Sequence, residues 1–359
     1  FYAAALAFSS DPNDKTYASQ TRAAAILEPL AARLPNHPGV AHYLIHAYDF
    51  PALAPKAIPA ANRYAEIAPA SAHALHMPSH TYTRVGEWRE SIATNIRSAS
   101  AANAEGAVGE TLHANDYLMY AYLQTGQDSA AARVLAALPA LAARYDPNGP
   151  TTGAPPAAAY FAMAAIPARY ALERGDWSSA AKLEVRQTAF PFADAITWFA
   201  RGIGAARMGD TVLSAEAVRQ LGQLREALAQ RKEAYWSQQV EIQSRGVEAW
   251  RAFAGGARPE ALAAMRATAD LEATTEKNAI TPGPIVPARE LLGEMLLASG
   301  DARTAYKEFE ATLVTEPRRY RAVAGAMRSA KAAGNTSAAQ RYAAQLAQLS
   351  EHGDRVAPR

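Results

Sequence analysis

Histidines gather in two short stretches of this 359-residue chain, "HYLIHAYDFP" from residue 42 and "HALHMPSHTYTRVGEW" from residue 73. These stretches hold five of the eight histidines, and seven of the eight lie between residues 37 and 113. A neutral imidazole is a common ligand for transition metals and also serves as a general acid or base. Whether these residues can act together depends on their spacing.

The spacing places three sets of polar residues on single faces of predicted helices. Side chains three, four and seven positions apart share one helix face. Because packed helices lie about 8–10 Å apart, imidazoles from adjacent helices could converge on one metal ion, or on two. The three sets are His42, His46 and Asp49; His73, His76 and His80; and His113, Asp116 and Tyr120.

The chemistry that these residue types favour is a metal site with open coordination positions, which could activate water or bind O₂. The chain has no cysteine, so thiolate sites are excluded. The predicted cofactor is a transition metal ion, either Zn, Fe, Cu or Mn. The predicted ligands are His42, His46, His76, His80, His113, Asp49 and Asp116, with His73 as a further candidate and Tyr82 or Tyr120 as candidates for a catalytic hydroxyl. In a second possible role, Asp49 and Asp116 accept a hydrogen bond from the other ring nitrogen of a metal-binding histidine.

An alternative is that the histidines only line a polar groove. His37 in "PNHPG" is interpreted as a loop residue, and His352 near the end of the chain as solvated. The chain contains no HExxH, GxSxG, phosphate-loop or dinucleotide motif in a suitable context, so these familiar enzyme classes receive no support.

The elements that must position these residues are helices. Apolar residues recur at spacings of three and four almost throughout, and strand patterns are nearly absent. Glycine-containing turns recur along the chain, and two of their intervals, from Gly175 to Gly209 and from Gly300 to Gly334, are 34 residues long. The turn glycines are Gly86, Gly126, Gly175, Gly209, Gly256, Gly300 and Gly334.

A helix–turn–helix period of 34 residues resembles the tetratricopeptide repeat (TPR). The resemblance is best in "ARELLGEMLLASGDARTAYKEFEATLVTEP", where Leu292 and Gly293 take the close-packing positions and Ala305 the helix contact, with Gly300 at the turn and Pro317 at the end. The predicted fold class is all-α, a TPR-like α-solenoid in which the repeats form a right-handed superhelix. The alternative is an irregular helical bundle.

Three parts of one continuous solenoid are predicted: residues 1–146 with the histidines, 157–276, and a C-terminal pair at 285–350. The breaks "YDPNGPTTGAPP" (145–156) and "KNAITPGPIVP" (277–287) are interpreted as connectors rather than as loops that reach across the groove. Pro78 is expected to bend the helix from His73 to His80, either to aim His76 and His80 at one point or only to suit local packing.

The segments "HPGVAHYLIHAYD", "APASAHALHMPSHTYTRVGEW" and "GPIVPARELLGEMLL" resemble a family of uncharacterised bacterial TPR proteins. The resemblance implies the solenoid fold and no particular reaction. It also implies further helical units upstream, which agrees with a chain that opens on the helical "FYAAALAFSS".

The charge balance limits the partners. Thirty-six basic residues against thirty-four acidic ones give a net charge of +2, so neither nucleic acid nor an anionic membrane is an expected partner, and no segment is long and apolar enough to span a bilayer. We expect a soluble protein of the cytoplasm or periplasm.

Two functional hypotheses follow. The first is a metal-dependent hydrolase or oxidoreductase that acts on a small, partly apolar substrate. Its pocket would have a polar His/Asp end and an apolar wall around Ile196, Phe199 and Ile203, with Arg169 nearby. The second is a non-catalytic scaffold that binds a peptide or partner protein in its groove.

Overall fold

The computed structural model describes residues 1–11, 14–151 and 153–355, and within these ranges the regular elements are all helices. No helix in the described ranges combines the length and apolarity needed to cross a membrane. The first half of the chain forms α1 (Tyr2–Phe8), α2 (Ala18–Arg33), α3 (Pro38–Ala47), the 3-10 helix η1 (Ala54–Ala57), α4 (Ile58–Ile67), α5 (Ala72–His76), α6 (Pro78–Val85), α7 (Trp88–Ala104), α8 (Val108–Gln124) and α9 (Asp128–Arg144).

The second half continues with helices of similar length, and successive helices pack against each other along the whole chain. This arrangement confirms the predicted α-solenoid. The helices are α10 (Pro156–Glu173), α11 (Trp177–Ala181), α12 (Pro191–Met208), α13 (Thr211–Gln230), α14 (Ala234–Ala254), α15 (Arg258–Glu272), α16 (Ala288–Ala298), α17 (Ala302–Thr315), α18 (Tyr320–Ala332) and α19 (Thr336–Leu349).

The turns between helices are set by glycine and by a capping residue. All seven predicted turn glycines have positive φ angles, as does Gly106, a conformation that side chains with a Cβ rarely adopt. In four of the turns the residue after the glycine is an Asp or Asn whose side chain accepts a backbone N–H of the next helix. These capping residues are Asp176, Asp210, Asp301 and Asn335.

Small residues allow the C-terminal helices to approach closely, as the repeat pattern predicted. A Cβ on Gly293 would lie 3.0 Å from the Phe309 ring, and one on Gly325 would lie 2.4 Å from it. The ring of Phe309 therefore fills the space that these two glycines leave, and Ala305 is fully buried beside it.

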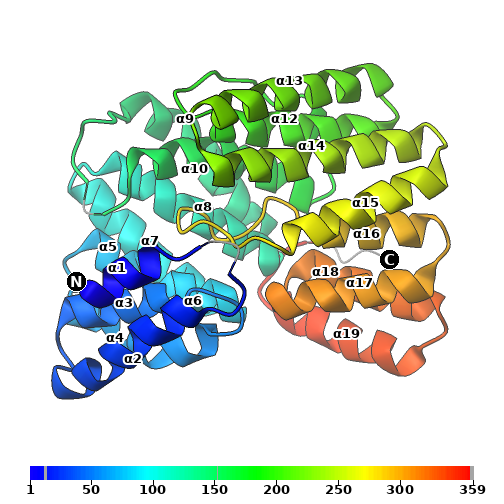
Figure 1. Ribbon diagram of the computed structural model, residues 1–359. Helices are drawn as coiled ribbons and strands as arrows, with labels where there is room; N and C mark the ends of the chain where they lie inside the picture. Colours follow the sequence, from blue (N-terminus) through cyan, green and yellow to red (C-terminus); the bar gives the residue numbers. More distant parts are fainter. Residues whose placement is uncertain (12–13, 152, 356–359) are drawn as a thin grey trace.

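The superhelix curls until its C-terminal units return to the middle of the chain. Helix α18 contacts α8, and the Trp88 indole N–H donates to the carbonyl of Arg318 over 3.0 Å. The segment between α15 and α16 lies in the centre of the molecule, between the N-terminal and C-terminal helices (Figure 1). Helix α8 is buried along almost its whole length, and it carries the third predicted set of polar residues.

Candidate metal centre and adjoining cavity

The six histidines between residues 42 and 113 form one continuous cluster. Neighbouring rings lie close together: His42 and His73 are 5.1 Å apart between centroids, His46 and His80 5.7 Å, and His76 and His113 4.4 Å. Helix α3 carries His42 and His46, and α5 carries His73 and His76. His80 lies on α6 and His113 on α8.

Two helix ends differ from the prediction, and both shape the cluster. Helix α3 ends at Ala47, so Asp49 lies beyond the helix and not on its face. Pro78 does not bend one continuous helix; it begins α6, after a break at Met77. Proline suits a first helical position because its missing N–H has no partner there. The break separates His76 from His80 into two helices that turn their rings toward each other.

His76, His80 and His113 form the tightest part of the cluster. Each offers one ring nitrogen, and the three nitrogens all lie within 4.8 Å of one another; all three residues are buried. The Nε2 atoms of His76 and His80 are 3.2 Å apart. Two nitrogens bound to one tetrahedral ion, each at about 2.0–2.1 Å, would be separated by about 3.3 Å, so this distance suits a shared ion.

Hydrogen bonds fix which nitrogen of His76 and His80 carries the proton. Nδ1 of His80 lies 3.1 Å from Oδ2 of Asp49, and Nδ1 of His76 lies 2.7 Å from Oδ1 of Asn95. The Asp49 carboxylate oxygen can only accept. Oδ1 of Asn95 also accepts, because the NH₂ group of the same amide donates to the Ser91 carbonyl. Both imidazoles therefore donate through Nδ1, and both Nε2 lone pairs face each other.

The cluster resists protonation. Burial, with help from neighbouring imidazoles, holds the pKa of His46, His76 and His113 well below the ordinary value. Burial also lowers the pKa of His80, although Asp49 opposes the shift, and it lowers the pKa of His42 to about 4. Neutral imidazole is the form that binds metals.

His42, His46 and His73 make a second, half-buried set beside the first. Nε2 of His42 lies 3.1 Å from Nε2 of His46 and 3.3 Å from Nε2 of His73. The carboxylate of Glu110, on α8, approaches Nδ1 of His73 to 4.0 Å. The structure thus groups all six histidines of the predicted ligand pool, but in two sets of three.

Asp49 supports the centre from outside. Besides His80, its carboxylate contacts Nε of Arg84 at 2.9 Å and Nζ of Lys277 at 2.9 Å. Burial alone would raise the pKa of Asp49, but these two cations hold it well below its usual value. A carboxylate that accepts the second N–H of a metal-binding histidine orients the ring and strengthens the ligand. This arrangement fits the second role predicted for Asp49.

Asp116 and Tyr120 face a different cluster. Oδ1 of Asp116 accepts the Nε–H of Arg169 over 2.9 Å, and the Tyr120 hydroxyl donates to Glu316 over 3.2 Å. The Tyr82 hydroxyl donates to Asn62 at an exposed position. Among the described residues, no hydrogen bond, ion pair or ring contact joins any of these three predicted residues to the histidines.

Sequence reasoning missed Tyr117, which lies one helical turn after His113. Its ring packs against His76 with 4.6 Å between centroids, and its hydroxyl lies 3.5 Å from Nε2 of His80 while donating to the carbonyl of Thr281 over 3.1 Å. The i+4 relation to His113 is the signal that could have found it.

Both long loops contact the histidines or the residues that surround them, so their interpretation as simple connectors is wrong. Lys277 of the second loop pairs with Asp49, and Thr281 accepts from Arg169. In the first loop, Gly153 lies so close to His73 that a Cβ there would meet the ring at 2.6 Å. Residue 152 of that loop lies outside the described ranges.

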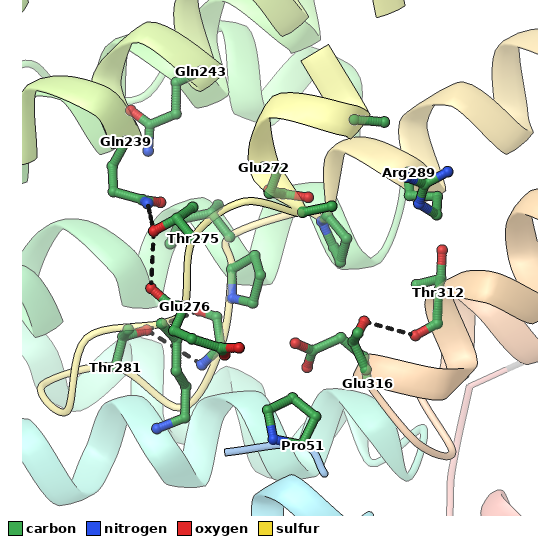
Figure 2. A pocket seen from close by; sticks show the side chains of 18 of the residues that line it. Pro51, Gln239, Gln243, Glu272, Thr275, Glu276, Thr281, Arg289, Thr312 and Glu316 are labelled. Carbon is green, nitrogen blue, oxygen red and sulfur yellow. Dashed lines mark hydrogen bonds between the residues drawn. The ribbon is translucent and has the colours of Figure 1, made fainter. Parts of the chain in front are cut away.

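A cavity of about 510 Å³ adjoins the centre, with Arg84 and Lys277 in its wall. Ile196 belongs to its apolar side, as predicted, whereas Phe199 and Ile203 are buried in the core. Figure 2 shows polar side chains entering the cavity from several elements, among them Gln239, Glu272 and Glu316. The cavity thus has a polar part and an apolar wall, but no histidine or aspartate of the described ranges lines it. The predicted His/Asp end is therefore not part of this cavity.

Comparison with known proteins adds little. No protein-family model matches the chain, and no curated protein matches it. One solved structure that is similar to this chain is the crystal structure of the P58(IPK) TPR domain, which has 11% sequence identity and a TM-score of 0.28 over 94% of this chain and 90% of that one. A TM-score this low carries no argument, so the fold assignment rests on the helices themselves.

Proposed function

We propose that the chain binds a transition metal ion through His76, His80 and His113, and that this ion serves a hydrolase or oxidoreductase reaction on a small substrate held in the adjoining cavity. The observation that carries the proposal is the pair of Nε2 lone pairs 3.2 Å apart. Two acceptors at that distance repel unless a proton or a cation lies between them. The lowered pKa of each ring disfavours the proton, so a metal cation is the partner that fits.

The donor set also supports an open site. Three neutral imidazoles leave at least one coordination position free, as catalytic metal centres require. The hydroxyl of Tyr117, near Nε2 of His80, is the polar group best placed beside that position. The set of His42, His46 and His73 would supply ligands for a second ion.

Elemental analysis tests the proposal. Protein purified without a His-tag should contain about one equivalent of a transition metal or more, and His76→Ala/His80→Ala should lose it. A matched control, His37→Ala/His352→Ala, removes two exposed histidines outside the cluster and should keep the metal. Metal-free wild type after growth in metal-supplemented medium would refute the proposal.

The identity of the metal would separate the two reaction classes. Zinc has no redox chemistry, so activity of the zinc-loaded protein on ester, amide or phosphate substrates would assign a hydrolase. Activity only with iron, copper or manganese, and dependent on O₂, would assign an oxidoreductase.

The scaffold hypothesis has less support. A peptide clamp needs an open concave groove, whereas the segment between α15 and α16 lies across the centre of the molecule (Figure 1). Its Lys277 and Thr281 are held there by Asp49 and Arg169. A scaffold would need this segment to move aside.

A further inference from the structure

The cavity beside the histidines has a charge pattern of its own. Four cationic residues line it, and each is paired with an acidic residue. Lys15 pairs with Glu276 at 2.8 Å, and Arg289 pairs with Glu308 at 2.7 Å. Arg84 and Lys277 both pair with Asp49. Each cation of the lining thus has a carboxylate within ion-pair distance, although Lys15, Arg84 and Lys277 share two carboxylates, those of Asp49 and Glu276.

Two carboxylates of the lining, those of Glu272 and Glu316, form no ion pair of this kind. Glu272 ends α15 and Glu316 follows α17, and Figure 2 shows the two side chains entering the cavity from different elements. Within the described part of the chain, no Lys, Arg or His nitrogen lies within 4.0 Å of either carboxylate. Each accepts one hydrogen bond through Oε2, from the Ala288 N–H and from the Tyr120 hydroxyl, respectively.

Another part of the lining is apolar and aromatic. Trp236 stacks on Phe192 with 4.0 Å between ring centroids, and Phe161, Ile196 and Ile285 also line the cavity. The buried Oε1 of Gln243, a further lining residue, has no hydrogen-bond partner among the described residues. The cavity therefore offers hydrogen-bond acceptors and negative charge together with a flat apolar surface.

We propose that this cavity binds an organic cation, with an ammonium group between Glu272 and Glu316 and an apolar, preferably aromatic body against Phe192 and Trp236. An ammonium group donates up to three hydrogen bonds and accepts none, which matches a lining of unpaired acceptors. A neutral ligand would leave the two carboxylates without a cation in direct contact, and the carboxylate of an anion placed between them would be repelled. This inference does not depend on the metal.

The electrostatics of the empty cavity agree with this assignment. Burial, together with the nearby Glu316 carboxylate, raises the pKa of Glu272 to about 7. Burial also raises the pKa of Glu316, although Arg84 and Arg319 oppose that shift. A cation between the two groups would remove this strain by favouring their ionised forms.

A ligand series of constant shape tests the charge preference. Tryptamine, tryptophol and indolepropionate share the indole ring and carry a cation, a hydroxyl and a carboxylate. Isothermal titration at about pH 8, where Glu272 is ionised, on EDTA-treated protein keeps the result independent of the metal. We expect tryptamine to bind at least about tenfold more tightly than tryptophol, with indolepropionate the weakest.

A variant locates the preference. Glu272→Gln/Glu316→Gln removes both charges and keeps the shape, and it should reduce the advantage of tryptamine over tryptophol to less than about twofold. Glu226→Gln/Glu260→Gln removes two exposed charges elsewhere and should leave the advantage intact. Circular dichroism checks that each variant folds.

The wild-type titration decides the proposal even if the double variant fails to fold. Equal binding of tryptamine and tryptophol, tighter binding of indolepropionate, or no binding of tryptamine at millimolar concentration would each overturn it. An undiminished preference in a folded Glu272→Gln/Glu316→Gln variant would show that the cation binds elsewhere, which also overturns it.

Discussion

Two buried polar clusters meet on α8, and their polar groups are compensated in different ways. The histidine cluster contains His113 and the five histidines of α3, α5 and α6. The arginine cluster contains Asp116, which accepts a hydrogen bond from Arg169, and continues to Arg319 and Arg321 near the C-terminal helices. Both clusters lie in the interior, where an unpaired polar group is costly.

The arginine cluster supplies its own counterions. Arg319 is fully buried and contacts the carboxylates of Glu173 and Glu290, and Arg321 contacts Glu290 and Glu294. Each guanidinium there has a carboxylate partner, and the cluster ties α10 and α16 to the start of α18. Such a network needs no ligand to explain it.

The histidine cluster lacks a counterpart of this kind. The Nδ1 atoms of His80 and His76 are hydrogen-bonded to Asp49 and Asn95, but the Nε2 atoms of these two histidines face each other with no donor between them. The difference supports the proposal that the histidine cluster receives a cation, whereas the arginine cluster holds the fold together.

The largest effect is expected on the arginine side. Arg319→Ala would leave Glu173 and Glu290 buried without their shared partner, and breaking a buried pair in this way costs about 3–5 kcal/mol. Urea unfolding measures the loss, while the metal content per folded molecule should not change. Arg186→Ala, which breaks an exposed pair with Glu184, should cost less than about 1 kcal/mol. Similar losses in both variants would contradict this comparison.

On the histidine side, the large effect should come from adding a metal. Zinc at about one hundred times its dissociation constant should stabilise the folded wild type by about 2.7 kcal/mol, measured as a higher midpoint of thermal unfolding that EDTA reverses. His76→Ala/His80→Ala should show no such shift. A zinc-induced shift of equal size in that variant would place the ion elsewhere.

The two aspartates sharpen the comparison further. Asp49→Asn removes the carboxylate behind His80, so we expect zinc affinity to fall about tenfold to a hundredfold, measured by competition with a chromophoric chelator. Asp116→Asn, on the same helix as His113 but facing Arg169, should leave the affinity unchanged and lower only the stability. Equal zinc affinities in the two variants would show that Asp49 does not support the metal-binding histidines.

Much of the fold could be predicted from the sequence because its signals are local. A turn glycine acts within a few residues, so Gly300 marked a helix boundary correctly. The close-packing positions around Gly293 were equally visible, since glycine and alanine stand out in a repeat.

The candidate site was predictable only for residues whose spacing places them on one face of the same helix. His76, His80 and His113 were found because their spacing marks one face of each helix. Lys277 was missed, because it comes from a loop more than two hundred residues after Asp49, which it contacts. Tyr120 was assigned to the histidine face by its i+7 spacing, yet over two turns α8 changes partners and directs this residue to Glu316.

The pH dependence of stability isolates the histidines without any added metal. Their pKa values in the folded protein lie below the unfolded value of about 6.5. Below that pH these imidazoles bind protons in the unfolded chain but not in the folded protein. The stability of the metal-free wild type should therefore be fully present above about pH 6.5 and fall by about 1.4 kcal/mol per pH unit for each such imidazole as the pH drops.

The difference between wild type and His76→Ala/His80→Ala is the quantity to measure, by urea unfolding between about pH 7 and 5. Glu272 acts in the opposite sense, because its raised pKa of about 7 contributes stability that is lost as the pH rises through that value. This contribution is present in both proteins and cancels in the difference. We expect the pH slope of the wild type to be the steeper one. Parallel slopes would mean that the two imidazoles can be protonated in the folded state. A proton could then lie between their Nε2 atoms, and no metal cation would be needed there.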